Sequence, residues 1–255
     1  MNDPHESKIV LVTGASSGIG QAIARRFAAS GHRVIAAGRR IDRLRELERE
    51  FPGRCLALYM DISDVDAARA AIETLPESFG RIDVLINSAG VAMGDAPAHT
   101  AEWSDWQKTI ETNVLGLAAV THAVLPQMVA RRSGDIVNIS SITANYPYPK
   151  GHVYGATKAF VRQFTLNLKA DLAGLGVRAI CIEPGTTVTE FAANRVGHDP
   201  QKIAAIYGDR SLLKAEDVAG IVHYAVSLPR HINMNSIEVM SGNQTFSFFG
   251  YVDDQ

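Results

Sequence analysis

The sequence predicts one α/β domain, a doubly wound parallel sheet of about seven strands with helices on both faces. Its 255 residues suit a single domain with an ample core. Short apolar runs rich in β-branched residues alternate with helical patterns, and the connections between them are short. No linker, repeat or low-complexity stretch interrupts this order, so residues 1–255 are expected to fold as one unit.

The composition excludes several classes of protein. Hydrophobic residues make up 46%, charged residues 20%, and the net charge is -2. This balance gives no reason to expect nucleic acid or an anionic membrane surface as a partner. The polar opening and the lack of an apolar run near ~20 residues leave a cytoplasmic protein as the default. Cys55 and Cys181 lie in apolar strand-like runs and are expected to be buried packing thiols, with no disulfide or metal site.

The first strand is predicted at residues 8–13, an apolar run typical of a buried parallel strand. It leads into Thr-Gly-Ala-Ser-Ser-Gly-Ile-Gly and then into a helical pattern that ends at Gly31. This order places backbone N–H groups and a helix N-terminus at a phosphate, as in a Rossmann-type nucleotide site. A glycine cluster alone can be a plain turn, but this context favours nucleotide binding. The expected cofactor contacts here are Gly14, Ser16, Ser17, Gly18, Ile19 and Gly20.

The second strand, at residues 33–37, ends in Gly38-Arg39-Arg40. In dinucleotide folds an acid at this point binds the 2′-hydroxyl of the adenosine ribose. Here two guanidinium groups stand instead, which suits a 2′-phosphate. The alternative is that they simply begin the solvated, charged helix 42–50. The pattern favours NADP(H) over NAD(H), mainly through Arg39.

Further strands supply the remaining cofactor contacts. The run at 54–60 ends in Asp61 and Ile62, which can bracket an adenine. The run at 82–86 ends in small residues that leave room for a ribose: Asn87, Ser88, Ala89 and Gly90. One long helix is predicted at 105–128, with Asn113 as a polar residue that must find partners, kinking the helix or organising a water. Strands at 136–141, 177–182 and 236–240 and a helix ending at Leu172 complete the order.

Tyr154 and Lys158 stand one helical turn apart, so they share a face of the helix that follows Ser141. A free tyrosine has a pKa near ~10 and exchanges protons poorly at neutral pH. An ammonium ~4 Å away at an effective dielectric of ~20 would stabilise the phenolate by ~4 kcal/mol, enough to lower its pKa by up to ~3 before screening. Ser141 ends a strand, where its hydroxyl can hold a substrate oxygen. A Tyr-x-x-x-Lys pair alone is usually solvated, so the interpretation depends on the other motifs.

Together these motifs resemble those of the short-chain dehydrogenase/reductase family: Thr-Gly-x-x-x-Gly-Ile-Gly, Asn-x-Ala-Gly, Asn113, Ser-x12-Tyr-x3-Lys and Pro-Gly-x-x-x-Thr. The resemblance extends over nearly the whole chain. It implies that Tyr154 is the general acid/base, that Lys158 lowers its pKa and holds the nicotinamide ribose, and that Ser141, not Ser140, orients the substrate. It also implies a relay water at Asn113 and nicotinamide contacts from Pro184, Gly185 and Thr189. Ser88 departs from the usual Asn-Asn-Ala-Gly and leaves a hydroxyl near the site.

Within the family the sequence is similar to bacterial NADP-dependent 3-hydroxy acid dehydrogenases and to the enzymes that reduce sulfoacetaldehyde to isethionate. Both substrates are small and anionic, and an anion needs a fixed cation and several donors. Arg195 is the first basic residue of a predicted lid at 186–210 and has apolar neighbours, although it could also lie on a solvated helix face. Asn145 and Tyr148 stand between Ser141 and Tyr154, where they could donate to a substrate or merely shape a turn. Gln244 follows the last strand, whose C-terminal end points to the ligand crevice.

The donor-rich set favours sulfoacetaldehyde, bound by Arg195, Gln244, Asn145, Tyr148 and a water on Ser88. A serine or 3-hydroxypropionate type of dehydrogenase is the alternative, and a non-catalytic NADP(H) sensor on the same fold is a distant one. Sugar-nucleotide epimerases share Tyr-x-x-x-Lys but need a further substrate domain. The aromatic tail at about 241–255 is too apolar to lie in water, so it is expected to pack on its own domain or against another subunit. The family resemblance implies a homotetramer, which favours the tail at an interface.

Overall fold

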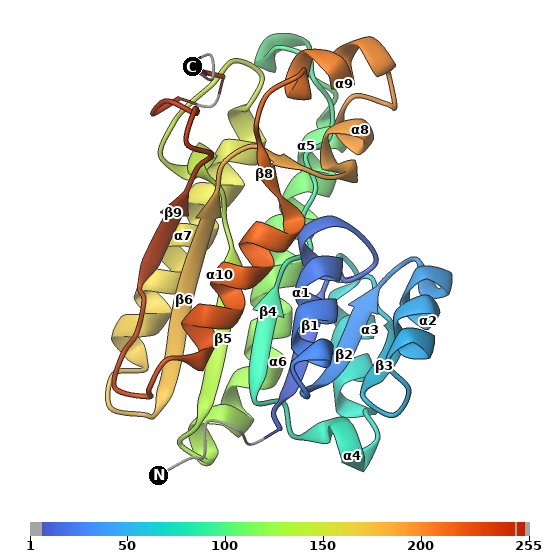
Figure 1. Ribbon diagram of the computed structural model, residues 1–255, viewed down its shortest axis with the longest axis vertical. Helices are drawn as coiled ribbons and strands as arrows, with labels where there is room; N and C mark the ends of the chain where they lie inside the picture. Colours follow the sequence, from blue (N-terminus) through green and yellow to red (C-terminus); the bar gives the residue numbers. More distant parts are fainter. Residues whose placement is uncertain (1–6, 248, 253–255) are drawn as a thin grey trace.

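The computed structural model describes residues 7–247 and 249–252. Its centre is a seven-stranded sheet in the order β3-β2-β1-β4-β5-β6-β9, in which every neighbouring pair runs parallel (Figure 1). The strands are β1 (Ile9–Thr13), β2 (Arg33–Gly38), β3 (Cys55–Tyr59), β4 (Val84–Asn87), β5 (Gly134–Ile139), β6 (Val177–Pro184) and β9 (Ser236–Val239). The predicted doubly wound fold is confirmed, and each predicted strand is present with ends shifted by at most two residues.

Helices cover both faces of this sheet. They are α1 (Gly18–Ala29), α2 (Ile41–Glu50), α3 (Val65–Glu73), α4 (Glu77–Gly80), α5 (Trp103–Ile110), α6 (Leu117–Ala130), α7 (His152–Asp171), α8 (Glu190–Arg195), α9 (Pro200–Tyr207) and α10 (Ala215–Ser227). Helices α1, α2 and α10 pack on one face, and α3, α6 and α7 on the other.

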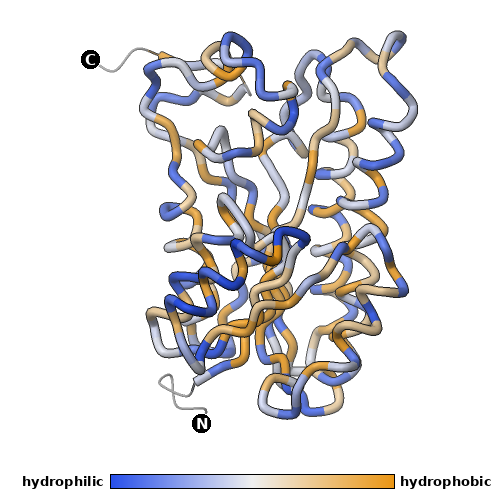
Figure 2. Tube along the Cα trace, turned by 90° about the vertical axis from the view of Figure 1, so that its right-hand side faces the viewer, coloured by the Kyte–Doolittle hydropathy of each residue, from blue (hydrophilic) through white to orange (hydrophobic). Residues whose placement is uncertain are grey.

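The period-2 alternation of strand side chains divides the core into two layers. Val10 and Val12 of β1 point into the layer under α1 and α10, whereas Ile9 and Leu11 point into the layer under α3 and α6. Figure 2 shows the hydrophobic strand segments running through the middle of the molecule. Cys55 and Cys181 are free and buried, as predicted.

The helix predicted at 105–128 is continuous from α5 to α6 but contains one π-helical stretch, Glu111–Gly116, which includes Asn113. A Cβ on Gly116 would lie 2.4 Å from the Ile62 carbonyl oxygen, so only glycine allows this helix to approach the end of β3 so closely. By length and composition the stretch Trp103–Ala130 could cross a membrane. In this structure α6 instead buries Leu117, Val120 and Val124 in the protein core.

The region predicted as a lid, 186–210, contains β7 (Thr187–Val188), α8 and α9. β7 pairs in parallel with β8 (Leu213–Lys214), which forms a second, two-stranded sheet beyond the carboxyl ends of the main strands. Asp199 caps α9 by accepting from the backbone N–H groups of Gln201 and Lys202. Movement of this region as a lid remains a prediction.

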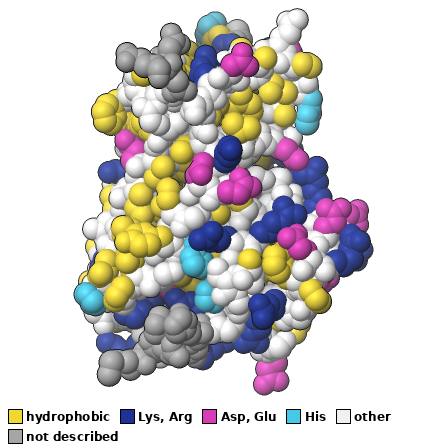
Figure 3. All heavy atoms as spheres, viewed as in Figure 1, with side chains coloured by type: hydrophobic (Ala, Val, Ile, Leu, Met, Phe, Trp, Pro, Cys, Tyr) yellow, Lys and Arg dark blue, Asp and Glu magenta, His cyan; other side chains and the backbone are white. Residues whose placement is uncertain are grey.

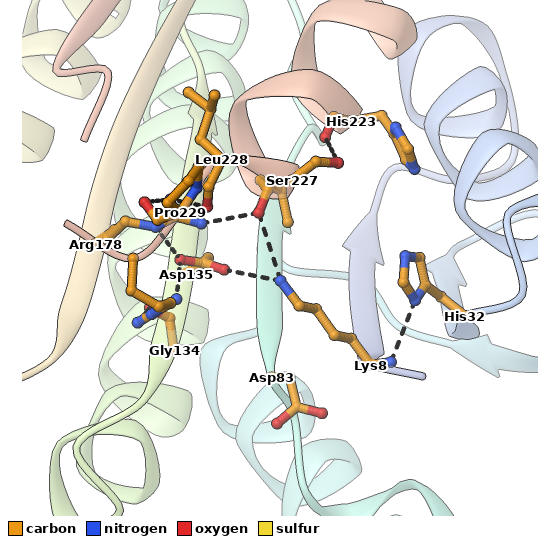
Figure 4. Close-up of polar contacts among 12 residues, drawn as sticks. Lys8, His32, Asp83, Gly134, Asp135, Arg178, His223, Ser227, Leu228 and Pro229 are labelled. Atoms are coloured by element: carbon orange, nitrogen blue, oxygen red, sulfur yellow. Dashed lines mark hydrogen bonds and ion pairs between the residues drawn. The ribbon is translucent and has the colours of Figure 1, made fainter. Parts of the chain in front are cut away.

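At the opposite end of the sheet, a buried ion cluster fixes the starts of β5 and β6 (Figure 4). Asp135 is 1% exposed and accepts from Arg178 and Arg230 at 2.7 Å each, while the ammonium of Lys8 lies 3.7 Å away. Arg178 also donates to backbone carbonyls in the last turn of α10 and just after it, those of Val226, Leu228 and Ile232. A buried carboxylate shared by several cations is costly to disrupt, so this cluster holds the strands whose far ends carry the site.

The described part of the tail divides into two kinds of residue. Phe246 and Phe249 are 80% and 52% exposed. Tyr251 instead pairs with Gln244 in an isolated antiparallel bridge and lies under the Arg210 guanidinium, 4.8 Å from its ring centroid. Phe248 and residues 253–255 lie outside the described residues. The predicted interface role of the tail stays a prediction.

Candidate active site

A cavity of about 790 Å³ opens at the carboxyl edge of the sheet, where a doubly wound fold binds its ligand. Its walls come from the loops after β1, β4, β5 and β6 and from α8 and α9. Most of the predicted site residues line it: Gly14, Ser16, Ser17, Gly18, Ile19, Gly20, Arg39, Arg40, Asp61, Ile62, Ser88, Ala89, Gly90, Ser141, Tyr148, Tyr154, Lys158, Pro184, Gly185, Thr189 and Arg195. The predicted positions from seven separate stretches of sequence therefore meet in one place.

The glycine turn has the geometry of a phosphate cradle. Gly14 and Gly18 have positive φ values of 70° and 54°, which side-chain-bearing residues rarely adopt. A Cβ on Gly14 would lie 2.7 Å from Ala89 Cα, and one on Gly20 would lie 2.5 Å from the Gly14 carbonyl oxygen. Any larger residue at these two positions would fill the turn from which α1 begins. The turn therefore leaves backbone N–H groups and a helix N-terminus facing the cavity, which suits the pyrophosphate of a dinucleotide.

Ser141, Tyr154 and Lys158 lie together at the inner end of the cavity. The three side chains are nearly buried, at 6%, 9% and 6% exposure. The Ser141 hydroxyl accepts from the Thr143 backbone N–H at 3.2 Å and acts to lower the pKa of Tyr154. The Lys158 ammonium lies 5.8 Å from the centroid of the Tyr154 ring and donates to the Ile139 carbonyl at 2.9 Å. Ser140 is used elsewhere, since its hydroxyl donates to the Lys158 carbonyl within α7.

The expected lowering of the tyrosine pKa by the lysine is wrong for this structure. Burial raises the pKa of Tyr154, the Tyr148 side chain raises it further, and the hydrogen bond from Ser141 and the charge of Arg195 oppose the rise only in part. Burial likewise lowers the pKa of Lys158 to about 8. Desolvation is the largest cause of both shifts. At neutral pH Tyr154 is a protonated phenol, the form that can give a proton to a carbonyl.

Asn113 lies behind Tyr154 and Lys158 and does not border the cavity. Its side chain is 1% exposed, accepts from the Val91 backbone N–H at 2.8 Å, and donates to the Val91 carbonyl and to Thr157. The amide therefore joins the π-helical stretch to the loop after β4 and to α7, one residue before Lys158. The partners that a buried amide requires are found within the protein. A relay water at Asn113 stays a prediction.

The two arginines after β2 have different environments. Arg40 donates to Ser16 at 3.2 Å, to Ser17, and to Glu190 at 2.7 Å. Arg39 lines the cavity and is exposed, and its guanidinium makes no hydrogen bond or ion pair to any residue in 7–247 or 249–252. The pKa of Asp61 is lowered overall. Burial acts to raise it, but hydrogen bonds from Ser63 and the charge of Arg39 lower it.

Arg195 projects over the cavity and not into bulk water. Its guanidinium donates to the Tyr148 hydroxyl at 2.6 Å, to the Lys150 carbonyl at 2.7 Å and to the Gly94 carbonyl at 3.4 Å, and lies 5.3 Å from the Tyr148 ring centroid. It thus joins α8 to the loop between β5 and α7. Its charge also acts to lower the pKa of Tyr154, which burial raises.

Comparisons with known proteins agree with this geometry. Residues 8–199 match the family model described as short chain dehydrogenase. This chain belongs to the short-chain dehydrogenase family. It is 46% identical over 246 residues to sulfoacetaldehyde reductase 2 of Chromohalobacter salexigens, covering 95% of this chain and 98% of that protein. It is also 46% identical over 240 residues to the NADP-dependent 3-hydroxy acid dehydrogenase of Salmonella typhi, covering 94% and 97%.

A solved structure agrees as well. The closed form of serine dehydrogenase complexed with NADP+ superposes with a TM-score of 0.91 at 46% identity, covering 93% of this chain and 96% of that one. The predicted family and fold are therefore confirmed, and the chain is an oxidoreductase of the short-chain dehydrogenase family.

Besides Asn113, three predicted site residues of this short-chain dehydrogenase do not border the cavity. Asn145 donates its amide to Glu183 at 2.7 Å and to Glu238 at 3.0 Å. Gln244 lies behind the loop at Gly185, where its Oε1 accepts from the Thr186 backbone N–H at 3.3 Å. Asn87 is 2% exposed and donates to Thr121 and Asn138 between β4, β5 and α6. The direct substrate or cofactor contacts expected of these amides stay predictions, and in the structure other protein groups hold all three side chains.

Several cavity residues were not predicted. Phe191 packs on Tyr154, with ring centroids 5.4 Å apart, and Met93 adds a further apolar surface. Tyr207 of α9 accepts from the Thr189 N–H at 3.3 Å and donates to the Thr189 carbonyl at 2.8 Å. Phe191 was visible in the sequence as the apolar neighbour of the predicted arginine. The contact of Tyr207 joins two lid segments, and no local pattern indicates it.

Proposed function

We propose that this chain is an NADPH-dependent reductase of small anionic aldehydes, with sulfoacetaldehyde as substrate and isethionate as product. The observation that carries the proposal is Arg195, a cation held over the same cavity wall as the proton donor Tyr154. Within one pocket the chain thus pairs a fixed guanidinium with a buried phenol. A sulfonate offers three acceptor oxygens, which suit the fork of a guanidinium together with the Tyr148 hydroxyl.

The proposed cofactor would be held by residues already in place. The glycine turn would take the pyrophosphate, Arg39 and Arg40 the 2′-phosphate, Asp61 and Ile62 the adenine, and Lys158, Pro184, Gly185 and Thr189 the nicotinamide half. When bound, NADPH supplies the hydride that reduces the carbonyl carbon. The relatives support this choice, since the serine dehydrogenase structure contains NADP+ and the Salmonella relative is NADP-dependent.

Each catalytic side chain has a defined task in the proposed reduction. Ser141 donates a hydrogen bond to the aldehyde oxygen and fixes it beside Tyr154. Tyr154 then gives its proton to that oxygen, which becomes the hydroxyl of the product. The raised pKa keeps the phenol protonated until the oxygen turns basic, which favours reduction at neutral pH. Lys158 supports the adjacent turn through its bond to the Ile139 carbonyl.

The acidic residues of the cavity favour a substrate without an ammonium group. Three carboxylates line its described walls, Asp61, Asp95 and Glu190. Asp95 is paired with Lys202 at 2.9 Å, and Glu190 with Arg40 and Arg43 at the adenosine end. Asp61 accepts from Ser63 beside β3. L-Serine would need an acceptor for its ammonium near Arg195, so sulfoacetaldehyde fits better. Serine or 3-hydroxypropionate oxidation is the second candidate, on the strength of the relatives.

A substrate panel tests the proposal. NADPH oxidation would be followed with sulfoacetaldehyde and with 3-oxopropanoate, and NADP+ reduction with L-serine. We expect the highest kcat/KM for sulfoacetaldehyde. An equal or higher value for 3-oxopropanoate or L-serine would refute the sulfonate assignment, and no turnover with the whole panel would support a non-catalytic sensor instead.

We also propose a homotetramer, with the tail at an interface, in the cytoplasm. The exposed rings of Phe246 and Phe249 support this, because large apolar side chains gathered on a surface commonly mark an interface. Removing residues 246–255 should reduce the number of subunits per particle, as measured from the molar mass by light scattering. An unchanged number of subunits would contradict the proposal that the tail lies at an interface.

A further inference from the structure

Glu190 joins the predicted lid to the adenosine end of the cavity. It is the first residue of α8, and its carboxylate accepts from Arg40 at 2.7 Å and from Arg43 of α2 at 2.6 Å. In Figure 3 basic and acidic side chains gather on the side of the molecule where Figure 1 places α2. The side chains of all three residues are 40–43% exposed. Ion pairs this exposed are individually weak, so a stronger anion can displace one of them.

Because of the contact with Glu190, the two guanidiniums expected to face a 2′-phosphate have different partners. The Arg39 guanidinium has no hydrogen-bond partner among the described residues, whereas that of Arg40 is bound by Ser16, Ser17 and Glu190. Arg39, Arg40 and Glu190 all line the cavity. The backbone keeps Glu190 in place, because Thr189 touches the glycine turn: a Cβ on Gly18 would lie 3.2 Å from Thr189 Cβ. The Glu190 carboxylate therefore occupies Arg40, the donor that a 2′-phosphate would also need.

We propose that Glu190 determines cofactor specificity by competing with the 2′-phosphate for Arg40. This inference rests on the proposed NADP(H) cofactor. A 2′-phosphate carries close to two charges and three acceptor oxygens, so it takes Arg40 from the monoanionic carboxylate, and Glu190 keeps Arg43 as its partner. The carboxylate remains near the phosphate and repels it. Glu190 therefore limits the affinity for the phosphorylated cofactor and leaves that for the unphosphorylated one nearly unchanged.

The test measures binding and not turnover. Isothermal titration would give Kd values for adenosine 2′,5′-bisphosphate and for 5′-AMP with the full chain, with Glu190→Gln and with Glu46→Gln as a control. Glu46 is an exposed residue of the same helix as Arg43 and makes no ion pair in the described part of the chain. Removing one negative charge beside a dianion at a protein surface should tighten the bisphosphate by about threefold to tenfold at low salt. 5′-AMP with Glu190→Gln, and both ligands with Glu46→Gln, should stay within about twofold of wild type.

The possible results separate this inference from the proposed cofactor. Weaker bisphosphate binding by Glu190→Gln would mean that the carboxylate orients Arg40, and it would overturn the competition. An equal gain for both ligands, or for both variants, would overturn it too, because the effect would not be specific to the 2′-phosphate and Glu190. A wild-type protein that binds 5′-AMP as tightly as the bisphosphate would refute the 2′-phosphate site itself, and with it the proposed NADP(H) preference.

Discussion

Replacing Arg195 with alanine separates recognition of the anion from the chemistry of the carbonyl. In the structure the guanidinium donates to the Tyr148 hydroxyl and to the Lys150 and Gly94 carbonyls, so a substrate anion must exchange with some of these partners. Hydrogen bonds to a charged group contribute ~1.5–3 kcal/mol each, and two of them to a sulfonate would give ~3–6 kcal/mol. Loss of one or two present partners offsets part of this gain. We therefore expect a net loss of ~2–3 kcal/mol in Arg195→Ala, or roughly 30- to 150-fold in kcat/KM.

The assay compares sulfoacetaldehyde with a neutral aldehyde of similar size, such as propionaldehyde, by NADPH oxidation. The neutral substrate should change by less than about threefold, because it makes no ionic contact. Arg195→Lys is the matched control: it keeps the charge and loses the planar fork, so its loss should fall between those of wild type and alanine. Equal losses for the anionic and the neutral aldehyde would refute the role of Arg195 in binding the anion.

Two further predictions concern the turn and the stability of the fold. Gly20→Ala should weaken NADPH binding by about tenfold or more and destabilise the protein by ~1–3 kcal/mol, because the new Cβ would lie 2.5 Å from the Gly14 carbonyl oxygen. Gly220→Ala in α10 meets nothing within 4 Å and should leave binding unchanged, which calorimetry and titration can check. His32 and His223 lie near each other, with ring centroids 6.2 Å apart (Figure 4). Burial lowers the pKa of both, and charges such as that of Lys8 add to the effect. Both histidines are neutral in the fold above the unfolded pKa of ~6.5, and the stability that this provides is lost as the pH falls below that value. The Tm of a variant with glutamine at both positions should therefore depend less on pH between about pH 7 and 5 than that of wild type. An equally steep decline would contradict that assignment.

The sequence alone was sufficient for the fold and for most of the site, because their signals are local. Strand, glycine turn and helix follow one another directly around Gly14 and Gly20, and Tyr154 and Lys158 are four residues apart on one helix. Ser141 could be placed because it ends a strand whose carboxyl edge meets the same crevice. In each case, short-range spacing and parallel-sheet topology determine where the side chain lies.

The remaining features depend on partners far away in the chain. Asn145 was expected to face the substrate, but its amide is bound by Glu183 and Glu238, 38 and 93 residues later. Likewise the contact of Glu190 with Arg40 spans 150 residues. The pKa of Tyr154 could not be predicted either, because it depends on how deeply the phenol is buried. A pairwise estimate from the spacing of the lysine includes the attraction and omits the desolvation.

The central claim is that Tyr154 gives a proton to a carbonyl while NADPH reduces it. Single-turnover oxidation of NADPH by sulfoacetaldehyde, measured for wild type and for Tyr154→Phe at matched cofactor occupancy, tests it most directly. We predict that the variant binds NADPH within about threefold of wild type and reduces the aldehyde slower by ~100-fold or more, the usual contribution of a general acid. Turnover by the phenylalanine variant at a rate close to that of wild type would contradict the account.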